Sequence, residues 1–184
     1  MEVYLIRHTS VDIDSNVCYG QSDVPLSSTF EEESQKIIQE LNIDFEKVYS
    51  SPLSRCTLLS NKFSTSVETD TRLLEINFGE WEGKKWDVIH KKELELWMKE
   101  FIFQRPPNGE NLQNMYLRVS NFLEELRTKN FKSTLIVTHS GVIRCMLADI
   151  LQISLQNIFK FEIRYGRYIH LNLSKDRIMD RILA

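Results

Sequence analysis

Short apolar runs alternate with amphipathic stretches along this chain. Val3 to Ile6 and Leu135 to Val137 are β-rich runs of the kind that form buried central strands. Between them lie longer stretches whose apolar residues recur three and four positions apart, which is the helical spacing. Strands that alternate with helices predict an α/β sandwich around a mostly parallel sheet.

The same patterns predict the individual elements. Thr9 to Ser28 reads as a long loop, because it carries Asp, Ser, Asn, Gly and Pro and shows little periodicity. No linker, repeat or low-complexity run interrupts the chain, so residues 1–184 are expected to form one domain. Besides the two central strands, we expect helices over 31–41, 54–63, 86–103, 110–127 and 142–151, strands over 48–50 and 66–69, and two strands in the tail.

Composition narrows the function classes. The formal net charge is −3 and no basic stripe is present, which argues against a nucleic-acid partner. The three cysteines are widely spaced and odd in number, as expected in a reducing compartment. No signal peptide and no long apolar run is visible, so we expect a cytoplasmic protein without a membrane partner. A homodimer is left open.

Basic side chains follow three of the predicted strands. Arg7 and His8 end the first strand, His139 follows the later central strand, and Arg55 comes just after the strand over 48–50. Ligands of parallel sheets bind at the carboxyl ends of strands, so these side chains are expected to surround one small space. Such a cluster repels itself, and a phosphate dianion would make it favourable because guanidinium groups match its oxygens.

Five motifs along the chain resemble, in their order, those of the histidine phosphatase superfamily, in its phosphoglycerate-mutase-like branch: RHT, SSPLSR, LLEINFGEWEG, PPNGEN and VTHSG. The resemblance implies a three-layer α/β/α fold with a six-stranded mixed sheet. It also implies that His8 is a nucleophile that forms a phosphohistidine, which water then hydrolyses. Neither a cofactor nor a metal is implied, and no two histidines have short metal-ligand spacing.

The chemistry agrees with these roles. Imidazole attacks phosphorus only when neutral, and a carbonyl that accepts from its other nitrogen would hold the correct tautomer. Arg7, Arg55 and His139 can stabilise the transition state, and His139 is expected to be protonated beside a bound dianion. Glu75 matches the family's acid position, where it would protonate the leaving group. Glu82 is expected to be structural.

One loop points to a subfamily. CYGQSDVPL, from Cys18 to Leu26, resembles the corresponding loop of α-ribazole phosphatases, which remove the 5′-phosphate of α-ribazole phosphate in adenosylcobalamin assembly. Gln21 and Ser22 in this loop are candidate donors to phosphate or ribose, and Tyr19 is placed to face an aromatic base. Ser140 replaces the usual glycine after His139, so its hydroxyl is a further candidate phosphate donor.

The leading hypothesis is therefore a metal-independent phosphomonoesterase for a small phosphorylated metabolite, α-ribazole 5′-phosphate being the favoured substrate. One rival is a phosphatase of broad or sugar-phosphate specificity, or one that acts on phosphohistidine proteins. Another is a silent phosphate-binding module on the same fold. His90 and His170 are expected to have no function, and Arg164 and Arg167 are weak candidates for contact with a substrate anion.

Overall fold

The computed structural model describes residues 1–183, and Ala184, the last residue of the predicted tail, lies outside them. The core of the fold is a six-stranded sheet in the order β3-β2-β4-β1-β5-β6. The strands β1 to β4 run parallel, whereas β5 and β6 are antiparallel to their neighbours. Their bounds are β1 Glu2–Arg7, β2 Lys47–Ser50, β3 Val67–Thr69, β4 Ser133–Thr138, β5 Tyr168–Asn172 and β6 Arg181–Ile182.

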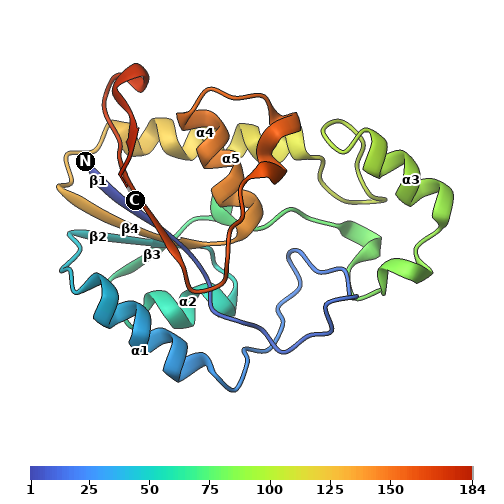
Figure 1. The fold of residues 1–184 in the computed structure, drawn as a ribbon, viewed down its shortest axis with the longest axis horizontal. Helices are drawn as coiled ribbons and strands as arrows, with labels where there is room; N and C mark the ends of the chain where they lie inside the picture. The colour runs from blue at the N-terminus through green and yellow to red at the C-terminus, as the bar shows by residue number, and fades with distance from the viewer. Residues whose placement is uncertain (184) are drawn as a thin grey trace.

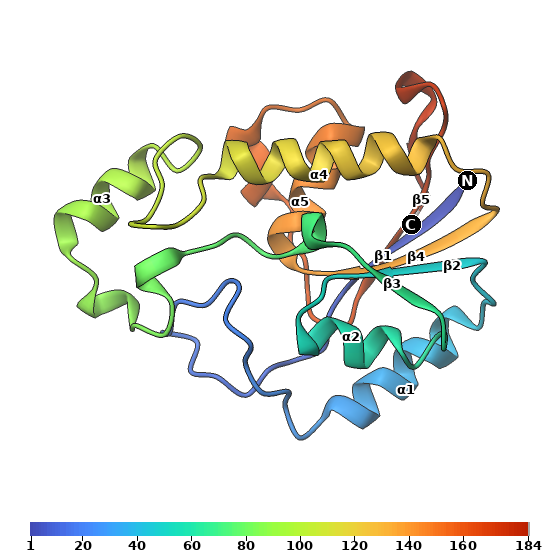
Figure 2. The ribbon, with the colours of Figure 1, turned by 180° about the vertical axis from the view of Figure 1, so that it is seen from behind.

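Helices cover both faces of this sheet, as Figures 1 and 2 show. Alternate residues of β1 point to opposite faces, so Val3 and Leu5 pack under one layer while Tyr4 and Ile6 pack under the other. The first layer contains α4 (Leu112–Arg127) and α5 (Ser140–Ile150), and the second contains α1 (Phe30–Leu41) and α2 (Ser54–Ser60). The predicted three-layer α/β/α fold with a six-stranded mixed sheet is therefore confirmed.

The prediction of one long helix over 86–103 is wrong. The chain forms a short 3₁₀ turn, Trp86–Val88, and then α3, Lys91–Lys99. Ile89 interrupts the helix because its side chain is buried with Trp81 beneath this segment, and the backbone there is extended. In Figure 1, α3 lies at the end of the molecule opposite the chain termini.

A smaller correction concerns the start of α4. The helix was predicted from Glu110, but it begins at Leu112, where the Asn111 side chain caps it by accepting from the Asn114 backbone N–H at 2.8 Å. Glu110 instead forms a bidentate ion pair with Arg118 one and a half turns along the helix, with both contacts at 2.8 Å.

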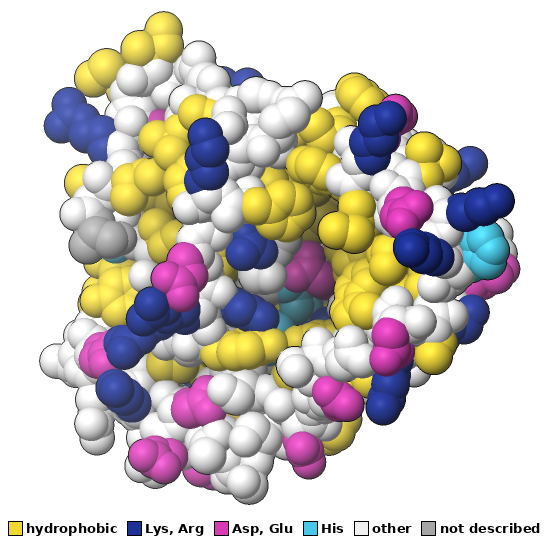
Figure 3. Space-filling model, turned by 45° about the vertical axis from the view of Figure 1, so that its right-hand side comes forward, with side chains coloured by type: hydrophobic (Ala, Val, Ile, Leu, Met, Phe, Trp, Pro, Cys, Tyr) yellow, Lys and Arg dark blue, Asp and Glu magenta, His cyan; other side chains and the backbone are white. Residues whose placement is uncertain are grey.

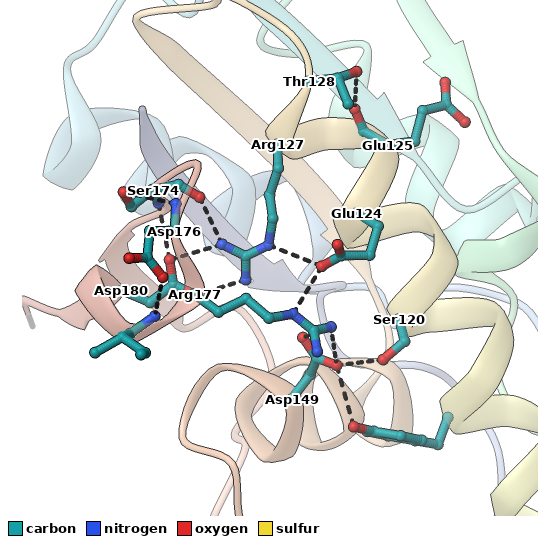
Figure 4. A network of polar contacts seen from close by, with 12 residues as sticks. Ser120, Glu124, Glu125, Arg127, Thr128, Asp149, Ser174, Asp176, Arg177 and Asp180 are labelled. Carbon is teal, nitrogen blue, oxygen red and sulfur yellow. Dashed lines mark hydrogen bonds and ion pairs between the residues drawn. The ribbon is translucent and has the colours of Figure 1, made fainter.

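The C-terminal hairpin is fastened to α4 and α5 by a polar network (Figure 4). The Arg127 guanidinium donates to both carboxylate oxygens of Asp180, at 2.8 and 2.6 Å, and these two side chains are only 5% and 0% exposed. Arg177 donates to both oxygens of Asp149 at 2.9 and 3.0 Å, and Ser120 also donates to Asp149. The network holds the turn of the hairpin near the amino end of β1, where Glu2 pairs with Asn172.

Across residues 1–183, every helix is too short or too polar to cross a lipid bilayer.

Candidate active site

The carboxyl ends of three adjacent parallel strands meet at one edge of the sheet. β4 lies between β1 and β2, and the pairing of Arg7 with Thr138 continues into a backbone bond from His8 N–H to the Thr138 carbonyl at 3.0 Å. Consequently His8 and His139, which are 131 positions apart in the chain, face each other with ring centroids 5.1 Å apart. The predicted meeting of the strand ends is confirmed.

His8 is buried and its tautomer is held by the backbone. Its Nδ1 lies 2.8 Å from the carbonyl oxygen of Thr9, so Nδ1 carries the proton and Nε2 keeps its lone pair. Burial and the nearby charge of Arg55 lower the pKa of His8 from 6.5 to about 3, although the bond to Thr9 opposes this change. The ring is therefore neutral at physiological pH, with a lone pair free on Nε2.

His139 immediately precedes α5 and is also buried. One of its ring nitrogens lies 2.8 Å from the Ser51 hydroxyl, which anchors the ring to the end of β2. The protein groups around it, burial first and then His8 and Arg55, hold its pKa well below the ordinary value. A dianion beside the ring would act in the opposite direction, so the protonated state expected for His139 stays a prediction.

Each of two arginines beside the histidines is held at one edge by backbone carbonyls. Arg55, which is fully buried on α2, donates to the carbonyl oxygens of Gly20 at 2.6 Å and Ser22 at 2.8 Å. Arg7 donates to the carbonyl oxygen of Ile163 at 2.7 Å. The Nε atoms of both arginines are buried and find no acceptor within residues 1–183. A buried donor without a partner is costly, so both atoms are available to a ligand.

Glu75 faces this cluster from a loop that two other segments hold in place. Its carboxylate accepts from the backbone N–H groups of Ile76 at 3.0 Å and Gly141 at 3.1 Å. The approach to Gly141 requires glycine, because a Cβ atom there would lie 2.2 Å from Glu75 Oε1. The Glu75 backbone carbonyl accepts from Arg118 at 3.1 Å and from the Gln21 amide at 2.9 Å. The Glu110–Arg118 ion pair thus positions the Glu75 loop.

These side chains line a cavity of about 240 Å³. In Figure 3 the molecule is hollowed, with histidine, basic and acidic side chains inside the hollow and hydrophobic side chains around it. The apolar wall comes from the segment after Glu75, from α3 and its C-terminal turn, from α4, and from the 3₁₀ helix Leu155–Lys160: Ile76, Phe78, Trp97, Phe101, Leu112, Met115, Ile158 and Phe159. The cavity therefore pairs a cationic end with an aromatic-rich wall.

The cavity contains only some of the predicted phosphate-binding residues. His8, His139, Arg7, Arg55, Glu75 and Ser140 all line it, whereas the side chains of Gln21 and Ser22 are used elsewhere. The Gln21 amide donates to the Glu75 carbonyl, and the Ser22 hydroxyl donates to Glu82. Glu82 also accepts from the backbone N–H groups of Gln21, Ser22 and Phe78. These bonds hold the loop in place, which is a structural role.

Sequence reasoning missed Arg144. It lies one turn after Ser140 on α5 and lines the same cavity. Its Nε donates to the Phe161 carbonyl at 3.1 Å, while its terminal nitrogens contact no acceptor within the described part of the chain. Burial lowers the pKa of this guanidinium, although it stays charged. The available signal was the place of Arg144 in the first turn of the helix predicted over 142–151, directly after the VTHSG motif.

Sequence reasoning also missed Tyr165. The flanking arginines, which were the weak candidates, turn away: Arg164 pairs with Glu162 at 2.8 Å and Arg167 with Glu40 at 3.4 Å, both at the exposed surface. The Tyr165 ring instead covers Arg7, whose guanidinium carbon is 3.5 Å from the ring centroid. Tyr19, expected to face an aromatic base, lines the cavity and meets Tyr165 through its hydroxyl.

Residues 1–183 contain no cluster of three or more His, Cys, Asp or Glu side chains placed to hold a metal ion.

The fold is that of an α/β protein with a ligand cavity at the carboxyl edge of its parallel strands. The two buried histidines and two arginines there, opposite one carboxylate, are suited to an anionic ligand. Residues 3–180 match the family model described as the histidine phosphatase superfamily (branch 1). The chain belongs to the histidine phosphatase superfamily.

Similar proteins carry several names. Phosphoserine phosphatase 1 of Hydrogenobacter thermophilus is 26% identical over 187 residues, covering 96% of this chain and 89% of that protein. The adenosylcobalamin/α-ribazole phosphatase of Salmonella typhimurium is 24% identical over 176 residues, covering 90% and 87%. The crystal structure of the α-ribazole phosphatase from Shigella flexneri superposes with a TM-score of 0.84 at 22% identity, covering 96% and 97% of the two chains.

Proposed function

We propose that this protein is a metal-independent phosphomonoesterase that works through a phosphohistidine on His8. The observation that carries the proposal is the pair of buried Nε donors of Arg7 and Arg55, which have no acceptor within residues 1–183 and flank a neutral, tautomer-fixed imidazole. A phosphoryl group supplies the missing acceptors and places phosphorus beside His8 Nε2.

The first half of the reaction transfers the phosphoryl group to the enzyme. His8 Nε2 attacks phosphorus with its lone pair, and the bond from phosphorus to the ester oxygen breaks. Arg7, Arg55 and His139 stabilise the charge on the equatorial oxygens. Glu75, in its protonated form, gives its proton to the departing alkoxide, which leaves as an alcohol.

The second half returns the enzyme to its starting state. Glu75, now a carboxylate, accepts a proton from a water molecule as the water oxygen attacks phosphorus. The phosphorus–nitrogen bond breaks, and its electron pair returns to His8 Nε2. Ser140, at the first turn of α5, donates to a phosphoryl oxygen in this scheme. Gln21 and Ser22 act through the loop that they hold rather than by direct contact with phosphate.

For the substrate, we propose α-ribazole 5′-phosphate. The CYGQSDVPL loop lies against the site, where Gly20 and Ser22 carry the acceptors of Arg55. The aromatic wall of the cavity, including Trp97 and Phe159, suits the dimethylbenzimidazole base of that compound. The similarity to the adenosylcobalamin/α-ribazole phosphatase of Salmonella typhimurium supports the same substrate. The three free, buried cysteines agree with a cytoplasmic location.

A second candidate function rests on Arg144. A partly buried guanidinium with free terminal nitrogens suits a substrate carboxylate, as in phosphorylated hydroxy or amino acids. The similarity to a phosphoserine phosphatase points in the same direction. Arg144 can also donate to ribose hydroxyls, so this residue alone does not decide between the two substrates.

The test is phosphate release by the purified protein in EDTA. The panel compares α-ribazole 5′-phosphate, phosphoserine, 3-phosphoglycerate and p-nitrophenyl phosphate by kcat/KM. A lead of about a hundredfold for α-ribazole phosphate, some 2.7 kcal/mol in transition-state stabilisation, supports the named substrate. A lead for the carboxylated esters favours the second candidate. Equal rates on all four would point to the broad-specificity rival.

His8→Ala tests the mechanism, and His90→Ala is the matched control because His90 is exposed at the start of α3. His8→Ala should retain at most about a thousandth of the wild-type turnover, because the loss of a nucleophile usually costs more than a factor of about a thousand. Stoichiometric ³²P labelling of the wild type, absent from His8→Ala, would identify the intermediate. Silence of the wild type on every substrate would favour the phosphate-binding module instead.

A further inference from the structure

Two tyrosines from distant parts of the chain meet beside the phosphate-binding arginines. The hydroxyl groups of Tyr19 and Tyr165 lie 2.7 Å apart and share a hydrogen bond. Tyr19 belongs to the loop after β1, and Tyr165 belongs to the turn before β5, 146 positions later. Burial raises the pKa of Tyr19, so its hydroxyl keeps the proton that such a bond requires.

The Tyr165 turn encloses Arg7. The Ile163 carbonyl accepts from the guanidinium at 2.7 Å, and the Gly166 N–H donates to the Arg7 carbonyl at 3.1 Å. The Tyr165 ring covers one face of the guanidinium at 3.5 Å, and its centroid lies 5.4 Å from that of His8. With one edge bound and one face covered, Arg7 has little freedom, and its unpartnered Nε is held in place.

The Tyr19 loop encloses Arg55 in the same way. Gly20, the next residue, accepts from Arg55 at 2.6 Å, and Ser22 accepts at 2.8 Å. The guanidinium carbon of Arg55 lies 5.6 Å from the centroid of the Tyr19 ring. Each tyrosine therefore belongs to the segment that holds one arginine, and the shared hydrogen bond joins the two segments.

The hydrogen bond between the two segments opposes an electrostatic repulsion within the site. Two guanidinium groups beside the same pair of histidines repel each other and would move apart or turn toward water. The π face of a tyrosine attracts a cation, and a hydrogen bond between the two rings prevents the segments from separating. Preorganised charges also stabilise a transition state without reorganising when the substrate arrives.

We propose that the Tyr19–Tyr165 hydrogen bond is a positioning bridge that fixes the distance and orientation of Arg7 and Arg55 for a phosphoryl group. The proposal rests on the phosphomonoesterase function above. Neither tyrosine takes part in bond making, and both act through the arginines.

A double-mutant cycle tests the bridge. Tyr19→Phe, Tyr165→Phe and the double variant each remove the same hydrogen bond while keeping both rings. We would measure the dissociation constant of inorganic phosphate by calorimetry, the inhibition constant of orthovanadate, and kcat and KM for p-nitrophenyl phosphate. Each single variant should weaken phosphate and vanadate binding about fivefold, as expected for one hydrogen bond, and the double variant should be no weaker than either single variant.

Tyr165→Leu extends the test, because it also removes the ring from Arg7. It should weaken anion binding by a further factor of about five, which is the scale of a cation–π contact. Tyr116→Phe is the matched control, since the Tyr116 hydroxyl donates to Asp149 and its loss should leave anion binding unchanged. Urea unfolding midpoints check that the variants fold. If Tyr165→Leu does not fold, the two Phe variants decide the question.

Three outcomes would overturn the bridge. Losses of the two Phe variants that multiply in the double variant would show that the hydroxyls act separately. Wild-type affinity in both Phe variants, with turnover of the wild type intact, would refute the bridge alone. A wild type that neither turns over substrate nor binds phosphate would refute the proposed function and the bridge together.

Discussion

The burial of His8 predicts a pH-dependent loss of stability that His8→Asn should remove. The folded protein holds the pKa of His8 at about 3, against 6.5 for an unperturbed histidine. The unfolded chain therefore binds a proton below pH 6.5 that the folded chain does not, and stability falls as the pH falls. The loss begins near pH 6.5 and ends near pH 3, where the folded protein also binds the proton.

The magnitude follows from the width of this window. Each pH unit between the two pKa values costs about 1.4 kcal/mol for one proton. At pH 5 the unfolded His8 is almost fully protonated and the folded His8 is neutral, so the cost is about 2 kcal/mol. At pH 7.5 it is about 0.1 kcal/mol or less, because the unfolded histidine is mostly neutral as well.

The assay is urea unfolding of the wild type and His8→Asn at pH 7.5 and pH 5.0, in a buffer free of phosphate. His8→Asn cannot titrate, so the stability difference between the two proteins should shift by about 2 kcal/mol in favour of the variant at pH 5.0. Any packing cost of the substitution is the same at both pH values and cancels. A difference that stays constant between the two pH values would refute the depressed pKa of His8 and, with it, the account of why this imidazole is neutral.

Three further substitutions test other parts of the structure. Glu75→Gln should lower kcat on an aliphatic phosphate ester on the order of a hundredfold but spare p-nitrophenyl phosphate, whose leaving group scarcely needs a proton; equal losses would argue against Glu75 as the acid. Arg144→Gln should raise KM about tenfold more for phosphoserine than for p-nitrophenyl phosphate if a carboxylate binds there, because a charged hydrogen bond is lost. Arg127→Met should lower the free energy of unfolding by about 3 kcal/mol by leaving Asp180 buried and unpaired; because the pair lies far from the cavity, a change in KM would contradict its purely structural role.

Much of the site was predictable because its signals are local. The apolar composition of Val3 to Ile6 is enough to predict a buried strand. The basic pair at the end of this strand is enough to predict an anionic ligand. His8, Arg55, Glu75 and His139 sit inside short motifs whose order marks the family, so the histidine pair and its arginines could be named before the structure. The carbonyl that fixes the His8 tautomer belongs to the next residue, Thr9.

Other features depend on partners that are distant in the chain. Gln21 and Ser22 have the right chemistry for phosphate, but Glu75 and Glu82 use their side chains, and only the tertiary structure brings those groups together. The chain does not form the single helix predicted over 86–103, because burial of Ile89 against Trp81 outweighs the helical pattern.

The sequence by itself determined the α/β alternation, the family and the candidate residues of the proposed reaction, since strand periodicity and short motifs are encoded by neighbours in the chain. The tertiary structure decided which groups surround those residues. Insertion of β4 between β1 and β2 sets the spacing of the histidines, and burial with Arg55 lowers the pKa of His8. Arg144 and Tyr165 join the site only because long-range packing places α5 and the turn before β5 beside the end of β1.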